Sequence, residues 1–378
     1  MKNVLLKWKD SKFLFNNLKN IEGLKIIGVT DRVTEKELDE SIKAAGINEI
    51  CDTLHAANLY LNGKCDAIIV SARLFIRTLE EIANEFIDFG VKESDIVIAS
   101  DEFFEEPDEK WLISWNKYYR LPYLEYHVAD HCNLNCSSCV HFSPLVKEPT
   151  FTDFDKLECD LMQLKRKVHY FDAIRILGGE PLLNDRLSDF IVMTRRIYPY
   201  CNLSLVTNGI ALKTISNELI DTINSCKVHV NVSLYPVMLN TMEGFLKDLR
   251  ERGLKNVSFS PPIKNFAIPF DENAGHLQFV NRINCTCPNL YNGKLFLCPL
   301  CAYLKYFNEY FQKSLSDEGG YIDIYDESLT FEEIKELLHK PFKLCDNCFY
   351  VSKEQQILRE WKSNSRPEIT DYMHSERN

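Results

Sequence analysis

Three cysteines that could bind a metal lie within eight residues, in the stretch DHCNLNCSSCVHF. They are Cys132, Cys136 and Cys139. Thiolates are ligands of zinc and of iron–sulfur clusters, and a closed site of either kind normally has four protein ligands. This stretch supplies three thiols, so a fourth ligand must come from elsewhere. Taken alone, the stretch also fits a zinc knuckle that takes a distant ligand.

The other cysteines are unevenly distributed. The chain has 378 residues and 14 cysteines, and most of these lie in close groups. The groups are Cys132/Cys136/Cys139, Cys285/Cys287, Cys298/Cys301 and Cys345/Cys348. No apolar run is long enough to span a membrane, and the first residues lack the apolar core of a signal peptide. We therefore expect a cytoplasmic protein, in which clustered thiols bind metals or carry out redox chemistry.

The net charge of −11 limits the partners. Proteins that bind nucleic acid usually carry a basic surface, so we expect no nucleic-acid partner and, without a membrane segment, no membrane partner. A small molecule or a peptide is the expected substrate.

Residues 1–115 alternate short apolar runs with helical patterns, which is typical of βαβ units on a parallel sheet. We predict a Rossmann-like domain here. The position of the usual glycine-rich phosphate loop reads LLKWKDSKF and contains no glycine. Dinucleotide binding is therefore not expected, and we predict a recognition or dimerisation role, with a homodimer as one outcome.

Residues 120–265 repeat the alternation of strands and helices more strictly. Such strands either close into a barrel or form an open wound sheet, and ligands gather at their carboxyl ends in both cases. Each predicted strand here ends in a polar or glycine-containing stub. The stubs are the cysteine loop, GGEP at 178–181, TNG at 207–209 and SLYP at 233–236.

The cysteine spacing after a first strand, followed by GGEP after the second, resembles the radical SAM enzymes. The resemblance implies a partial (β/α)6 barrel in an α/β fold. It also implies that Cys132, Cys136 and Cys139 hold a 4Fe-4S cluster whose fourth iron binds S-adenosylmethionine. Reductive cleavage of this cofactor yields a 5′-deoxyadenosyl radical, which abstracts hydrogen from the substrate. The electron would come from a low-potential donor such as flavodoxin or ferredoxin.

The same resemblance implies which residues bind the cofactor. Gly178, Gly179 and Glu180 match the motif that lines the methionine amino group. Asn208 and Ser233 lie at later strand ends, where the family contacts the ribose and the methionine moiety.

One residue departs from the family pattern. The position before the last cysteine is commonly aromatic and packs near the adenine, but here it is Ser138. His141 or Phe142 is expected to take its place.

Residues 280–355 carry the second cysteine group around LYNGKLFLC, a predicted hairpin with an Asn-Gly turn. This pattern resembles the twitch module, a shortened form of the SPASM extension, which binds one auxiliary 4Fe-4S cluster. We expect Cys287, Cys298, Cys345 and Cys348 to be its ligands. Cys285 and Cys301 remain alternatives, and a structural zinc site is the competing interpretation.

Two classes of function follow. The first is an enzyme that acts on a small hydroxylated substrate, such as a sugar, sugar nucleotide or cyclitol, most simply by oxidising it. Redox-neutral epimerisation or dehydration is an alternative, and an epimerase would use Cys301 as hydrogen donor. The second class is a maturase of ribosomally made peptides, which the Rossmann-like first domain disfavours. A simple electron carrier would need neither an open cluster nor GGEP.

Overall fold

The computed structural model of the chain describes residues 3–7, 25–29, 50–65, 67–71, 76–99, 112–239, 242–279, 285, 287–351 and 356–375. It divides into two compact units, Met1–Arg120 and Leu121–Asn378. One of the helical patterns of the first domain, at residues 34–46, lies outside the described residues, as does most of the LLKWKDSKF stretch. The mixed α/β class with parallel strands is confirmed.

The first unit contains one sheet with the order β3-β2-β1-β4-β5-β6 among its described residues. The strands are β1 (Asn3–Lys7), β2 (Lys25–Val29), β3 (Ile50–Cys51), β4 (Ala67–Ser71), β5 (Ile96–Ala99) and β6 (Leu112–Ser114). All neighbouring pairs are parallel except β5 and β6. The first five strands have the order of a dinucleotide-binding sheet. Helices α3 (Thr53–Leu61) and α4 (Ile76–Asp88) contribute Ala56, Ala83 and Phe86 to its core.

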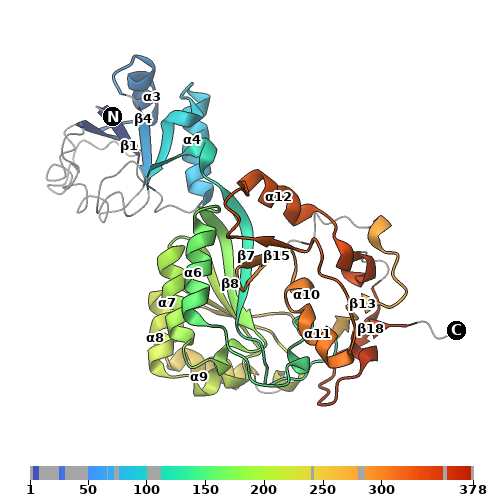
Figure 1. The fold of residues 1–378 in the computed structure, drawn as a ribbon. Coiled ribbons are helices and arrows are strands. Elements are labelled where there is room, and N and C mark those ends of the chain that lie inside the picture. Colours follow the sequence, from blue (N-terminus) through green and yellow to red (C-terminus); the bar gives the residue numbers. More distant parts are fainter. Residues whose placement is uncertain are drawn as a thin grey trace. The chain divides into compact units, whose positions relative to one another are not determined.

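Within its described residues, the second unit is built on an eight-stranded sheet with the order β11-β10-β9-β8-β7-β14-β15-β16. Its first strands are β7 (Arg120–Ala129), β8 (Tyr170–Gly178), β9 (Asn202–Thr207), β10 (His229–Val232) and β11 (Val257–Phe259). The helices between them are α6 (Phe154–Lys165), α7 (Leu187–Ile197), α8 (Asn217–Ser225) and α9 (Met242–Glu251). These strands and helices lie where the sequence predicted them, and helices α6 to α8 run along one face of the sheet (Figure 1).

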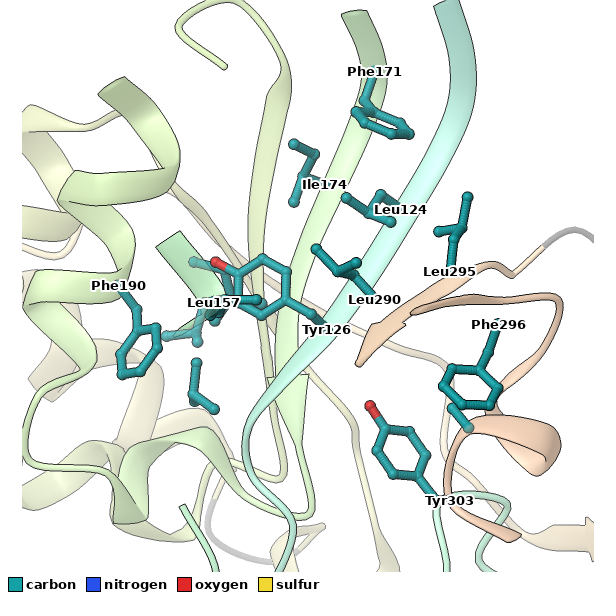
Figure 2. Close-up of a cluster of buried hydrophobic side chains, with 14 of the residues drawn as sticks. Leu124, Tyr126, Leu157, Phe171, Ile174, Phe190, Leu290, Leu295, Phe296 and Tyr303 are labelled. Atoms are coloured by element: carbon teal, nitrogen blue, oxygen red, sulfur yellow. The ribbon is translucent and has the colours of Figure 1, made fainter. Parts of the chain in front are cut away.

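The core of this unit lies between the sheet and these helices. Figure 2 shows Leu124 and Tyr126 of β7 beside Leu157 of α6 and Phe190 of α7. Successive side chains of a strand point to opposite faces, so residues 125, 127 and 129 face away from these helices. The same alternation turns Leu177 and Val206 to the face that points away from α6 to α8. A ligand at the strand ends can be reached from that face.

The C-terminal third extends the same sheet. Strands β14 (Asn289–Tyr291), β15 (Lys294–Phe296) and β16 (Tyr321–Asp323) are antiparallel to one another, and β14 pairs with β7. The expected hairpin is confirmed, because Asn292 and Gly293 both adopt positive φ at its turn. Helices α10 (Pro299–Ala302), α11 (Leu304–Phe311) and α12 (Phe331–His339) follow. Leu290 and Leu295 pack near Leu124, so this third shares the core of the parallel sheet (Figure 2).

Two small sheets connect the end of the chain to the middle of the unit. Strand β12 (Asn265–Ala267) pairs with β17 (Leu358–Glu360), and β13 (Phe270–Asp271) pairs with β18 (Met373–His374). Among the described residues, no helix has the length and apolar character needed to cross a membrane.

Candidate functional site

A cavity of about 130 Å³ opens at the carboxyl ends of β7 to β10. All predicted residues of the cofactor site except Glu180 line it. The lining residues are Cys132, Leu134, Cys136, Cys139, His141, Ser143, Leu177, Gly178, Gly179, Val206, Thr207, Asn208, Ser233 and Tyr235. The structure thus brings together stubs that are far apart in the sequence, from Cys132 to Tyr235.

Two sulfurs of the cysteine loop, those of Cys132 and Cys136, accept hydrogen bonds from N–H groups. The backbone N–H of Leu134 lies 3.3 Å from the Cys132 sulfur, and the Asn208 side-chain amide lies 3.6 Å from it. The Trp361 indole N–H donates to the Cys136 sulfur at 3.2 Å. Such donors favour the thiolate and are typical around the sulfurs of iron–sulfur clusters. The donor set therefore fits a thiolate-bound cluster.

The N–H donors favour the thiolate form of these cysteines, whereas burial favours the neutral thiol. Burial raises the pKa of the Cys132 and Cys136 thiols to about 12 and also raises the pKa of Cys139. Buried thiolates in this loop need a positive partner, and bound iron would supply one. Among the described residues, no three His, Cys, Asp or Glu side chains form a site for a single metal ion.

Gly178 and Gly179 lie against the protein's own backbone. A Cβ atom on Gly178 would lie 2.1 Å from the carbonyl oxygen of Ala129, and one on Gly179 would lie 2.3 Å from that of His131. The Gly179 N–H donates to Ala129 at 2.8 Å, and the Glu180 N–H donates to His131 at 3.0 Å. The two glycines thus fix the start of the cysteine loop against the end of β8.

Glu180 is fully buried and is absent from the described residues that line the cavity. Its carboxylate accepts hydrogen bonds from the Thr207 hydroxyl at 2.6 Å, the Asn208 N–H at 2.8 Å and the Leu182 N–H at 3.1 Å. Burial raises its pKa to about 7. In this structure Glu180 joins the ends of β8 and β9, whereas the sequence predicted that it binds the cofactor. Its role toward a cofactor stays a prediction.

Of the two residues expected to replace the aromatic neighbour of the adenine, His141 lines the cavity. Its Nδ1 lies 2.9 Å from Nε2 of His127, and burial lowers its pKa to about 3. Phe142 is fully buried and packs against Phe270 with a centroid distance of 5.9 Å. The Ser138 hydroxyl donates to the carbonyl of Asp371.

Residues 125–245 match a family model described as a 4Fe-4S single cluster domain. A GTP 3',8-cyclase of Clostridium acetobutylicum is 32% identical over 102 residues, which cover 26% of this chain and 31% of that protein. A GTP 3',8-cyclase of Helicobacter pylori is 30% identical over 149 residues, covering 36% and 45%. The chain thus spans less than half the length of these relatives.

The matched segment contains the cysteine loop, the paired glycines and Asn208. These similarities support a radical SAM domain in this part of the chain. Radical SAM proteins are enzymes, so the cavity at its strand ends is the candidate active site. A solved structure described as BtrN in complex with AdoMet and 2-DOIA is 17% identical and covers 61% of this chain and 94% of that chain, with a TM-score of 0.40. A likeness at that level assigns neither substrate nor reaction.

The second cysteine group lies beyond the radical SAM domain in sequence. Burial raises the pKa of the Cys348 thiol, and Cys298, Cys345 and Cys285 raise it further. Burial raises the pKa of Cys287 to about 11, with smaller contributions from Cys298 and Cys285 among others. These thiols therefore influence one another electrostatically, and the ligand set of an auxiliary cluster, with either Cys285 or Cys287, stays a prediction.

Cys301 has different surroundings. It is buried at 2% exposure, and its thiol lies 3.4 Å from the carbonyl oxygen of Gly320. A Cβ atom on Gly320 would lie 2.4 Å from the Cys301 sulfur, so the thiol fills the space left by that glycine. Cys301 is not among the described residues that line the radical SAM cavity. This packing gives no support to the hydrogen-donor role expected for an epimerase.

Sequence reasoning missed two aromatic residues of the site. Tyr235 lines the cavity, and burial together with the three loop cysteines raises its pKa. It belongs to the SLYP stub, so strand alternation from Ser233 could have identified it. Trp361 contacts Cys136 from a segment 225 residues away, and no local sequence signal marks it.

Proposed function

We propose that the chain cleaves S-adenosylmethionine at a 4Fe-4S cluster held by Cys132, Cys136 and Cys139, and abstracts hydrogen from a small hydroxylated substrate. The observation that carries the proposal is the cavity in which these cysteines meet Asn208 and Ser233. The bound cofactor would supply the hydrogen-abstracting radical. The side-chain amide of Asn208 is 2.7 Å from Asn133, which orients it at the rim of the cavity.

The face of the sheet that points away from α6 to α8 carries polar side chains that would suit a polar substrate. Asn231 lies on this face, where it pairs directly with Val206 of the neighbouring strand, and its side chain accepts a hydrogen bond from Ser258 at 2.9 Å. His229 lies 2.8 Å from the same hydroxyl. Side chains that already exchange hydrogen bonds with one another can exchange them with substrate hydroxyl groups.

We propose oxidation as the reaction. When hydrogen leaves a carbon that bears a hydroxyl group, the remaining radical must lose one electron and one proton to become a carbonyl. An auxiliary 4Fe-4S cluster on Cys287, Cys298, Cys345 and Cys348 would accept that electron. This electron transfer is supported by the proximity of the cysteine loop to the second cysteine group.

Phe270 and Tyr350 lie near both groups. Burial raises the pKa of Tyr350, and both Cys348 and Cys139 raise it further, so one thiol of each group lies within its electrostatic range. The backbone of Phe270 also forms a bridge with Cys348, while its ring packs on Phe142 of the cysteine loop. An electron could therefore pass between the groups through packed protein.

The proposed domain layout follows the sequence. Residues 1–115 would form a Rossmann-like domain without a dinucleotide, residues 120–265 the radical SAM core, and residues 280–355 the auxiliary cluster module. A flavodoxin or ferredoxin would supply electrons, and a cytoplasmic location would suit such oxygen-sensitive clusters.

The experiment is anaerobic reconstitution with iron and sulfide, followed by addition of dithionite and S-adenosylmethionine. The wild-type chain should release 5′-deoxyadenosine and methionine. Replacing Cys132, Cys136 and Cys139 together with Ala should abolish this, whereas Cys159→Ala, which changes an exposed thiol on α6, should not. Cleavage that persists in the triple variant would refute the proposed function.

A further inference from the structure

A short segment near the C-terminus reaches back to the cysteine loop. We call residues 358–364 the C-terminal strap. Its strand β17 pairs with β12, and the Trp361 N–H donates to the carbonyl of Lys264 at 2.8 Å. The strap is therefore anchored to the second unit by backbone hydrogen bonds just before it meets the loop.

The strap then contacts the loop by its backbone. The Ser137 N–H donates to the carbonyl of Lys362 at 3.1 Å, and the Asn364 N–H donates to the carbonyl of Asn135 at 2.7 Å. Cys136 and Ser363 form an isolated antiparallel bridge. Backbone contacts thus flank Cys136 on both sides and fix the position of its sulfur relative to the strap.

Trp361 directs its side chain at that sulfur. The indole Nε1 lies 3.2 Å from the Cys136 sulfur, and the half-buried ring packs on Tyr235 with a centroid distance of 5.8 Å. An indole nitrogen can only donate a hydrogen bond. Phenylalanine could provide the contact with Tyr235, but it could not provide the hydrogen bond.

Resting on the proposed function, we propose that Trp361 is a positioning residue that sets the reduction potential of the open cluster through Cys136. A hydrogen bond to a ligand sulfur stabilises negative charge on the cluster, and the reduced cluster carries one more negative charge than the oxidised one. The bond therefore favours reduction and raises the potential. Among the described residues, the other donors near the loop sulfurs are backbone N–H groups, the Asn208 amide and the Ser143 hydroxyl, and both of these side chains line the cavity. Trp361 does not line the cavity among the described residues, so it can be replaced without changing a cavity-lining side chain.

The test compares the wild-type chain with Trp361→Phe after reconstitution of the full chain. The open cluster is identified by the EPR signal that changes on addition of S-adenosylmethionine, and its midpoint potential is measured by redox titration. Trp361→Phe should retain its iron, and its midpoint potential should shift to a more negative value. Trp115→Phe is the matched control, because Trp115 packs on Tyr118 in the first unit and should leave the potential unchanged.

An unchanged potential in Trp361→Phe with full iron content would overturn this inference and leave the proposed function intact. Loss of the iron in Trp361→Phe would also overturn it, because Trp361 would then serve to retain the cluster. A wild-type chain with no cluster signal that responds to S-adenosylmethionine would overturn the proposed function and this inference with it.

Discussion

Replacing Gly179 with alanine tests whether close backbone packing positions the cysteine loop. The new Cβ would lie 2.3 Å from the His131 carbonyl oxygen and 2.7 Å from that of Asp130. Ordinary contacts are about 3.5 Å, so the loop must retreat by about 1 Å. This overpacking costs about 1–3 kcal/mol. Losing the bonds from Gly179 to Ala129 and from Glu180 to His131 adds about 1 kcal/mol for each.

The expected loss is therefore about 3–5 kcal/mol, a large fraction of the roughly 5–15 kcal/mol that stabilises a typical domain. Urea unfolding of the cluster-free chain, followed by circular dichroism, measures it. Because Cys132 directly follows His131, the variant should also retain less iron after reconstitution.

Gly244→Ala is the matched control for this measurement. Gly244 lies in α9, and a Cβ atom there would meet nothing within 4 Å. Alanine is the better helix former, so this change should leave the stability unchanged or raise it by up to about 1 kcal/mol. If Gly179→Ala lost less than about 1 kcal/mol relative to Gly244→Ala, the packing argument would be refuted.

Three further predictions concern the ionisation of Glu180, the auxiliary ligands and the reaction. The pKa of Glu180 is raised from 4.5 to about 7, so the native state holds a proton that the unfolded state releases between these values. The free energy of unfolding should fall as the pH rises through that window, and Glu180→Gln should flatten this dependence; an unaltered slope would contradict it. Changing Cys345 and Cys348 together to Ala should remove about four iron atoms per chain, and Cys287→Ala should do the same. If Cys287→Ala retained its iron and Cys285→Ala lost it, the ligand would be Cys285 and the assignment of Cys287 would be wrong. In deuterated water the true substrate should give a ketone, with one S-adenosylmethionine consumed per product; solvent deuterium at the reacting carbon would favour epimerisation instead.

The sequence was sufficient for the elements that depend on local pattern. Strands β7 to β11 and the helices between them follow from apolar alternation, and the Asn292-Gly293 turn follows from its residue types. The convergence of the polar stubs follows from topology, because parallel strands joined by helices have their carboxyl ends at one edge. These features needed no information about distant contacts.

The roles of single residues in GGEP could not be predicted in the same way. Glycine was expected there for the approach of a cofactor, but the structure also requires it for the approach of the Ala129 and His131 carbonyl groups. Glu180 was expected to bind the cofactor, which stays a prediction, and its carboxylate also accepts hydrogen bonds from Thr207 and Asn208. The same residue type can contact a cofactor or pack within the protein, so the sequence alone does not tell which of these two roles a residue has.

The strap illustrates the general reason for these limits. Its contacts with the cysteine loop join residues more than 200 positions apart, and most of them use backbone atoms that any residue could supply. Trp361 is the exception, because its hydrogen bond to Cys136 depends on one side chain. A cysteine loop shows in its sequence which atoms bind iron, but the donors that act on those sulfurs are set by the fold. The proposed effect of Trp361 on the reduction potential therefore rests on a contact that only the fold reveals.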